Sequence, residues 1–433
     1  MDSTRETLLK ELVKQKRWSY RDFVRTFEGA ADRIGARGLT ISEVTFRRWT
    51  AGKMRRRPNA DACRVLEAMF GVPAADLFKA SSSEVSPPTL NLEAEIEMTA
   101  RDAQNQAGEA ASASISDTVV EQLRDDVHAL ARTYHTRPPF EILCAARDLR
   151  EQAEHCRSRT QVPVQQQDLL ILAGQTCAIL ATAAFDLGSL DNATRLARSA
   201  ALYGETARFD PLRGFAGGTL AYIAYFSGRP SEAVRLARQA AMLPGLGDVA
   251  HRRLAAIEAR AYAHLGDTRS AQRALSLSTD GGNGVVDELH DQVGGEFGFS
   301  AERLAMSNGT TCLLLGDGQN AEAAAQHALD LVSAKVLTAR SLAIMGGAAA
   351  DLAAARLIRD DLDGASEALT KVLEVPSDQR ATGLLLRARQ VRRSLTGSRY
   401  QHTPLAGEMG EQLEDFVRVA QHQNSSSAGA LEF

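Results

Sequence analysis

Apolar side chains recur at intervals of three and four residues along most of the chain, which is the pattern of amphipathic helices. Within the first 80 residues the pattern predicts helices over residues 4–16, 19–35, 41–52 and 59–72. Ser19 and Ser42 stand where N-caps are expected, and Gly52 is placed to end the third helix. The sequence therefore predicts a small helical domain at residues 1–80.

The third of these helices has two faces of different chemistry. Phe46 and Trp49 lie three residues apart and share the face that enters the core. At about 100° per residue, five side chains then point away from the core. These are Val44, Thr45, Arg47, Arg48 and Ala51. Arginine can read guanine and small groups can contact thymine methyls, so this face suits a helix in a DNA major groove. The loop cations Lys53, Arg55, Arg56 and Arg57 are placed to contact phosphates.

A helix–turn–helix unit recurs in the second half of the chain. A small turn residue precedes an alanine by five positions in each unit. The pairs are Gly188/Ala193, Gly228/Ala233, Gly266/Ala271, Gly316/Ala321 and, without glycine, Asp360/Ala365. Glycine permits a positive φ in the turn, and alanine lets the paired helices approach closely. Such units cannot bury their apolar faces alone, so we expect them to stack. One longer step holds a glycine-rich segment at residues 281–299, expected to be a lid or a plain long loop.

These patterns predict an all-α protein with four parts. A helix-turn-helix domain at 1–80 is followed by a linker at 81–115, which is rich in Ser, Ala and Gln, with a short helix near residues 92–105. An α-solenoid occupies 116–400, and residues 401–433 form a C-terminal helix and a disordered tail.

The net charge of −4 hides an asymmetry. Residues 1–80 contain 17 Lys and Arg against 10 Asp and Glu, whereas the remainder contains 33 against 44. A polyanionic partner should therefore meet the N-terminal domain. The five cysteines have no metal-ligand spacing, and no signal peptide or long apolar run is evident, so we expect reduced thiols in a cytoplasmic protein without a membrane partner.

The stretches "VTFRRWTAGK" and "RRPNADACRVLEAMFGVPAADLF" resemble the lambda-repressor-like (XRE) helix-turn-helix family. The resemblance covers about residues 5–78 and implies sequence-specific binding to a double-stranded DNA operator. The repeats resemble degenerate tetratricopeptide (TPR-like) units. The order of the two parts is similar to actinobacterial regulators of this design and, more loosely, to peptide-sensing receptors. That resemblance implies a homodimer whose body binds a small-molecule or peptide effector.

Six polar or amphipathic residues on the repeat helices are candidates to line the effector groove: Tyr222, Tyr225, Arg260, Tyr262, Arg303 and Asn308. The alternative for each is packing between helices with one polar tip. No phosphate loop, nucleophile elbow or zinc-protease motif is present, so the sequence predicts no enzyme, cofactor or metal. The other reading of the whole chain is a TPR scaffold whose basic head binds protein.

Overall fold

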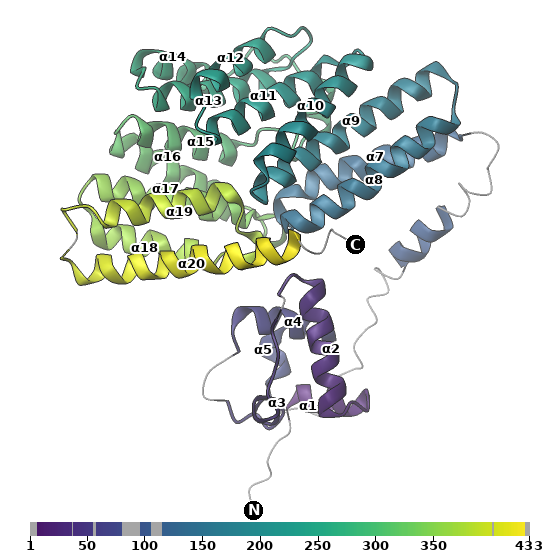
Figure 1. Ribbon diagram of the computed structural model, residues 1–433, viewed down its shortest axis with the longest axis vertical. Coiled ribbons are helices and arrows are strands. Elements are labelled where there is room, and N and C mark those ends of the chain that lie inside the picture. Colours follow the sequence, from purple (N-terminus) through teal and green to yellow (C-terminus); the bar gives the residue numbers. More distant parts are fainter. Residues whose placement is uncertain are drawn as a thin grey trace, which may run out of the picture. The chain divides into compact units, whose positions relative to one another are not determined.

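The computed structural model describes residues 7–36, 38–54, 58–79, 96–104, 115–400 and 402–428, with side chains up to residue 420. The chain divides into two compact units (Figure 1). The first is Met1–Glu109 with His422–Phe433, and its helices α1 to α5 are called the head; the second, Ala110–Gln421, is called the body. The regular elements of both are helices, so the predicted all-α class is confirmed.

The head consists of five helices that the apolar spacing largely predicts. They are α1 (Leu8–Gln15), α2 (Tyr20–Arg33), α3 (Glu43–Thr50), α4 (Ala60–Phe70) and α5 (Ala74–Leu77). Ser19 caps α2 in a reciprocal capping box with Asp22, and Ser42 caps α3 by accepting from the Thr45 amide. Both predicted N-caps are therefore confirmed.

Aromatic side chains join α2 to α3 in the head. Phe23 and Phe27 of α2 are fully buried. The Phe46 ring lies 4.8 Å from Phe23, and the Trp49 ring lies 6.4 Å from Phe27. The Tyr20 hydroxyl donates to the Ile41 carbonyl at 2.8 Å and fixes the start of α3. The two helices thus form the helix-turn-helix with one face of α3 anchored in the core.

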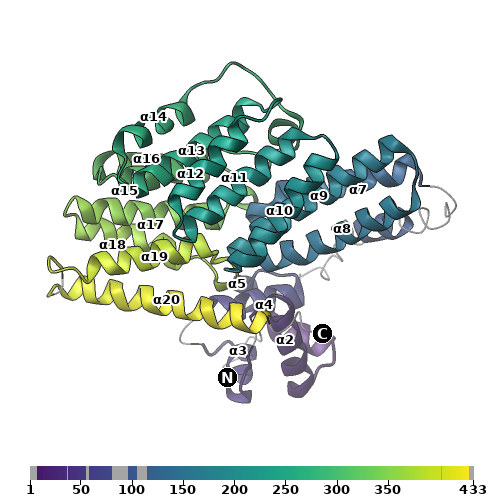
Figure 2. The same ribbon diagram turned by 45° about the horizontal axis from the view of Figure 1, so that its top comes forward.

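The body is a TPR-like solenoid of helix pairs. It begins with α7 (Asp117–Thr133) and α8 (Pro139–Arg159). Six pairs follow: α9 (Pro163–Asp186) and α10 (Leu190–Thr206), α11 (Asp210–Phe226) and α12 (Pro230–Ala241), α13 (Asp248–His264) and α14 (Thr268–Thr279), α15 (Ala301–Leu314) and α16 (Gly318–Ser333), α17 (Leu342–Ile358) and α18 (Leu362–Leu373), α19 (Thr382–Leu395) and α20 (Pro404–Ala428). Figure 2 shows these hairpins side by side from α9 to α20. The odd-numbered helices contact one another and form the inner layer.

The turn of each repeat has the predicted geometry. The four turn glycines have φ between 73° and 87°, and Asp360 takes the same left-handed conformation at 66°. All five alanines that follow by five positions are completely buried. The small residue in each slot therefore sets how closely the paired helices approach.

The inner layer closes on itself. Helix α19 contacts α9, where the Thr382 hydroxyl donates to the Asp186 carbonyl at 3.0 Å. The short helix η1 (Tyr134–Thr136) contacts α17, and α8 contacts η4 (Ser377–Gln379). The first and last helices of the repeat array thus enclose a common interior.

Residues 287–299 of the glycine-rich segment pack against the body and are not a plain exposed loop, whereas residues 281–286 are exposed. The segment contains the π-helical turn η2 (Glu288–Val293), and the amide of Glu296 donates to the Ala131 carbonyl of α7 at 2.8 Å. Phe297 is fully buried, with its ring 5.0 Å from that of Phe215. The segment is therefore part of the wall of the interior.

Two parts of the predicted domain plan fall largely outside the described residues. Within the predicted linker residues 96–104 are helical, while residues 81–95 and 105–114 lie outside the description. Helix α20 extends to Ala428, and the remainder of the predicted tail, residues 429–433, lies outside it as well. In the part of the chain that is described, one helix, α9, is long and apolar enough to cross a membrane, but 78% of its most apolar window is buried in the body.

Replacing Gly295 by alanine should destabilise the body. Gly295 has φ of 59°, and an added Cβ would overlap the backbone of Ala131 and Arg132. We expect a loss of at least about 3 kcal/mol from strain and overpacking together. Gly316 is the control because its φ is 74° but nothing lies near its Cβ position, so Gly316→Ala should cost only about 1–2 kcal/mol. Equal thermal unfolding midpoints for the two variants would contradict close packing of the segment on α7.

Candidate DNA-contact helix and an arginine-lined cavity

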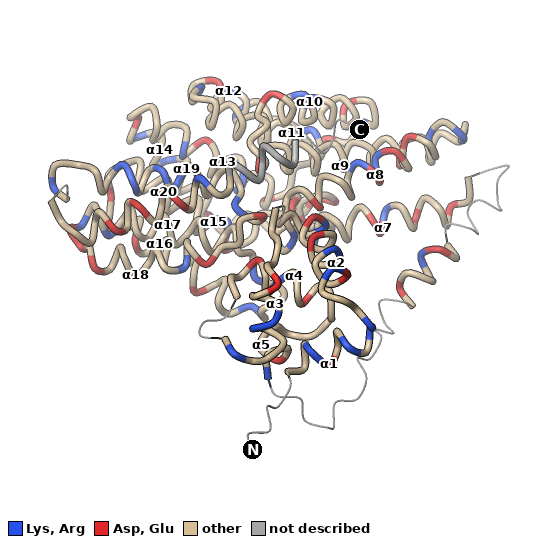
Figure 3. The backbone as a smooth tube through the Cα atoms, turned by 60° about the horizontal axis from the view of Figure 1, so that its bottom comes forward, with Lys and Arg blue, Asp and Glu red and all other residues tan. Residues whose placement is uncertain are grey.

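The outward face of α3 carries the residues predicted to contact bases. Val44 is 58% exposed, Arg47 and Arg48 are exposed, and Thr45 is half-buried. Trp49, on the opposite face, is 8% exposed. Figure 3 shows the Lys and Arg positions of α3 in blue. An exposed valine beside two arginines is a surface that can make both apolar and hydrogen-bonding contacts.

Arg47 and Arg48 differ in their local partners. The Arg47 guanidinium forms an ion pair with Glu43 at 2.5 Å, one helical turn earlier. Both side chains are more than half exposed, so this pair is screened and contributes little to stability. Arg48 forms no ion pair with the described residues. Lys53 is exposed after α3, whereas the predicted phosphate contacts Arg55, Arg56 and Arg57 lie outside the described residues.

The interior of the body contains a cavity of about 140 Å³. Its walls come from all six inner helices, from η1 and from the glycine-rich segment. Four arginines and two carboxylic acids lie on these walls: Arg253, Arg260, Arg303, Arg387, Asp186 and Glu296. Four arginines on the wall of one cavity are unusual for a helical core, because burying a charge is costly.

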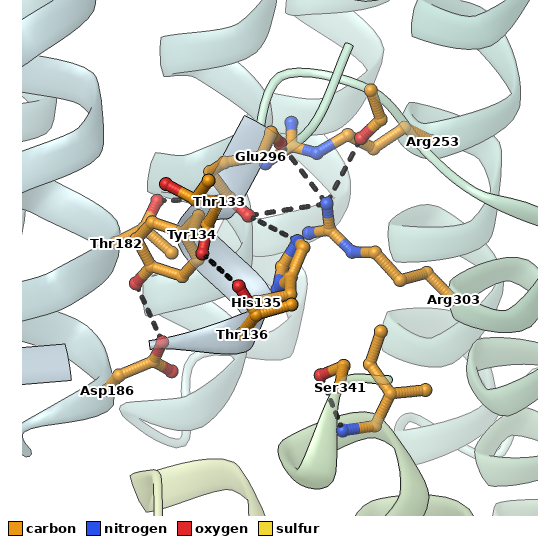
Figure 4. Close-up of polar contacts among 12 residues, drawn as sticks. Thr133, Tyr134, His135, Thr136, Thr182, Asp186, Arg253, Glu296, Arg303 and Ser341 are labelled. Carbon is orange, nitrogen blue, oxygen red and sulfur yellow. Dashed lines mark hydrogen bonds and ion pairs between the residues drawn. The ribbon is translucent and has the colours of Figure 1, made fainter. Parts of the chain in front are cut away.

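Glu296 is the centre of one polar cluster in the cavity wall (Figure 4). Its side chain is 1% exposed and lies 3.3 Å from the Arg303 guanidinium, and it accepts from the Thr182 hydroxyl at 3.1 Å. The His135 Nε2 lies 3.1 Å from Glu296 Oε2, and burial together with the Arg303 charge lowers the pKa of His135. Burial alone would raise the pKa of Glu296, but Arg303 and His135 lower it to about 2. Glu296 is therefore ionised and neutralises Arg303.

Asp186 forms a second cluster at the end of α9. Its carboxylate accepts from the Tyr134 hydroxyl at 2.8 Å. The residue is half-buried and lines the cavity. Burial raises the pKa of Asp186 to about 7, the Tyr134 hydrogen bond opposes this, and the Glu296 carboxylate adds to it. Near neutral pH this group is thus only partly charged.

Arg387 of α19 is fully paired. Its Nε donates to Asp351 at 3.0 Å, and its Nη2 donates to the Thr310 hydroxyl at 3.0 Å. Thr310 in turn donates to Asp351 at 2.6 Å. Asp351 and Arg387 are almost completely buried, so this network ties α15, α17 and α19 together.

The structure brings together three of the six predicted groove residues. Tyr222, Arg260 and Arg303 line the cavity. The other three do not. Tyr225 lies with its ring 5.8 Å from the Arg260 guanidinium, Tyr262 packs against a buried apolar cluster, and Asn308 accepts from Ser278.

Sequence reasoning missed four charged groups of the interior: Asp186, Arg253, Glu296 and Arg387. One signal for them was present. Arg253 and Arg260 are seven residues apart in an alanine-rich helix, so they share a face that is otherwise apolar. Within the described ranges, no group of three His, Cys, Asp or Glu side chains is placed to hold a metal.

No protein-family model matches the chain, and no curated protein matches it. Among solved structures, it is similar to a chain of the crystal structure of the APC/C hetero-tetramer Cut9-Hcn1. The identity is 13%, the TM-score is 0.40, and the match covers 97% of this chain and 71% of that chain.

Replacing Asp186 by asparagine should change how body stability depends on pH. The folded-state pKa of about 7 exceeds the ordinary value of 3.8, so Asp186 favours folding below the ordinary pKa, and this contribution is lost as pH rises through about 7. Asparagine stays neutral and can still accept from Tyr134. We therefore expect Asp186→Asn to raise the thermal unfolding midpoint more at about pH 8 than at about pH 5.

The control for this experiment is Asp191→Asn, since Asp191 is exposed in the first turn of α10. It should shift the midpoint by a similar small amount at both pH values. If Asp186→Asn behaved like this control, the carboxyl would be charged throughout the range and its assigned environment would be wrong.

Proposed function

We propose that this chain is a cytoplasmic, sequence-specific DNA-binding transcription regulator of the XRE type, and that it is not an enzyme. The observation that carries the proposal is the split of α3 into a core face and an outward face. Phe46 and Trp49 hold the helix by aromatic contacts, and Val44, Arg47 and Arg48 are left exposed. A helix held rigidly with an exposed arginine face is what readout in the major groove requires.

The body, in this proposal, forms the homodimer and receives an effector. Two copies of the head would then read two half-sites of the operator. The volume of the cavity, about 140 Å³, favours a small molecule over a peptide as the effector. The cavity lies among the inner helices, so its occupant would contact several repeats at once.

The rival candidate is a scaffold in which the head binds an acidic protein. A TPR-like solenoid is compatible with either role, so the fold does not separate them. The two candidates differ in what α3 must discriminate. A scaffold needs only positive charge, whereas a regulator loses base preference when one arginine is removed.

Arg48→Ala and Arg47→Ala should each weaken binding to the operator by roughly 1–3 kcal/mol and reduce preference among bases. The operator is first selected from bound genomic fragments, and affinities are then measured on it and on shuffled duplexes. Arg269→Ala, an exposed change of the same charge on α14 of the body, is the control and should leave both values unchanged. Full affinity and selectivity in both α3 variants would exclude this face of α3 as the reading surface.

Lys53→Gln should weaken binding to all duplexes alike, because a flexible cation after α3 is suited to phosphates and not to bases. The slope of log K against log salt should fall by about one. The same Arg269 position, changed to glutamine, controls for net charge. An unaltered salt slope for Lys53→Gln would argue against a phosphate contact at this position.

A further inference from the structure

Two buried arginines of the cavity have no carboxylate partner. Arg253 is 6% exposed and donates to the Phe215 carbonyl at 3.2 Å and to the Thr219 hydroxyl at 3.1 Å. Arg260 is 3% exposed and donates to the Ser307 hydroxyl at 3.0 Å. Its Nε has no hydrogen-bond partner. In the described part of the chain, neither guanidinium has an Asp or Glu oxygen within ion-pair distance.

The charges that line the cavity do not balance. Glu296 neutralises Arg303, and Asp351 neutralises Arg387. Asp186 is only partly charged near neutral pH because burial raises its pKa to about 7. Burial lowers the pKa of Arg253 to about 10, which still leaves it charged. The interior therefore holds an excess of roughly one to two positive charges, a costly state unless anionic groups join it.

The two unpaired cations have a defined separation on α13. Seven residues along a helix correspond to roughly 10 Å, and positions 253, 257 and 260 share one face. Ile257 therefore lies between the two arginines, and Ile223 of α11 lines the same cavity. Along this face of α13 a cation is followed by an apolar surface and then by a second cation. A complementary molecule would carry an acidic group at each end of a short hydrocarbon chain.

The volume limits the length of that chain. A cavity of about 150 Å³ in another protein holds benzene, and this cavity has about 140 Å³. A small molecule, on the order of ten non-hydrogen atoms, matches a cavity of this size. The Ser307 hydroxyl and Tyr222 ring beside Arg260 add polar and aromatic contacts at one end.

We propose that the cavity binds a small dicarboxylate, with one carboxylate at Arg253, the other at Arg260, and the chain between them against Ile257 and Ile223. The ligand is held by charge at both ends, so a monocarboxylate of the same length binds more weakly. This proposal rests on the proposed function only in making the ligand an effector of DNA binding. Binding itself requires no DNA.

The test is calorimetric titration of the full chain, without DNA, using succinate and glutarate as probes. Butyrate has one carboxylate fewer than succinate, and inorganic phosphate tests for a compact anion. We expect one of the two diacids to bind at least about tenfold more tightly than butyrate, because each charged hydrogen-bonded contact is worth at least that factor. No binding of either diacid, equal binding of butyrate, or tighter binding of phosphate would each overturn the proposal.

Arg253→Met and Arg260→Met should each reduce the affinity for the diacid by at least about tenfold. Arg273→Met, on the exposed surface of α14, is the matched control and should bind as the unaltered chain does. If a methionine variant does not fold, Arg253→Lys or Arg260→Lys replaces it. Lysine keeps the charge but loses the forked donor, so a several-fold loss is expected. Unchanged affinity in folded variants at both positions would overturn the assignment.

Operator affinity is then measured with and without the bound diacid. A diacid that binds as described but leaves operator affinity unchanged would remove the effector role and leave the binding site intact. Absence of operator binding in any condition would count against the proposed function alone.

Discussion

The body is organised around buried guanidinium groups, and their desolvation constrains everything that surrounds them. Arg253, Arg260 and Arg387 are each at most 10% exposed in the interior. A buried charge is tolerated where ion pairs, hydrogen bonds or aromatic faces replace water. Arg387 has Asp351, whereas Arg253 has a carbonyl, a hydroxyl and the ring of Phe215 at 4.3 Å. The inner helices must therefore hold their positions closely, since these partners come from different repeats.

Small residues make that close arrangement sterically feasible. A Cβ at Gly218 of α11 would overlap the Arg253 guanidinium, and one at Gly347 of α17 would lie 2.9 Å from the Met306 sulfur. Glycine within a helix lowers stability by about 1 kcal/mol relative to alanine. The packing and hydrogen bonds that the absent side chain makes possible must therefore stabilise the fold by more than this amount. A glycine in the glycine-rich segment also permits a close approach, here of one backbone to another. Gly295 lets its backbone approach α7, and this approach delivers Glu296 to the cavity.

The local parts of this fold are predictable from sequence because their causes are local. Ser19 and Ser42 each accept a hydrogen bond from an amide three residues later, and the glycine–alanine spacing of each repeat spans only five residues. The cavity is different. Thr382 meets Asp186 across 196 positions, and Arg132 meets Val293 across 161. No periodicity encodes such distances, which depend on how small rotations between repeats accumulate until the ring closes.

Only three of the six predicted groove residues line the cavity, because helical spacing predicts the face of a helix but not how neighbouring repeats pack. Helical spacing places Tyr222 and Arg260 on inner helices, and that much follows from the repeat pattern. Tyr225, one helical turn after Tyr222, packs instead against the buried cluster that contains Ala233 and Ala261. A charged residue within an otherwise apolar helix face is a better predictor of a cavity residue. Arg253 is such a residue, but its lack of a carboxylate partner depends on side chains from other repeats, which the sequence pattern does not place.

Contacts within the body connect the cavity with α7. Glu296 contributes its side chain to the cavity and its amide to the Ala131 carbonyl near the end of α7. Helix α7 is the first helix of the body in the sequence. Contact alone is not coupling. A ligand shifts an equilibrium only by its difference in affinity between two arrangements. In the proposed site, charge would supply such a difference, because an anion would favour the arrangement that holds the two guanidinium groups of Arg253 and Arg260 close to it.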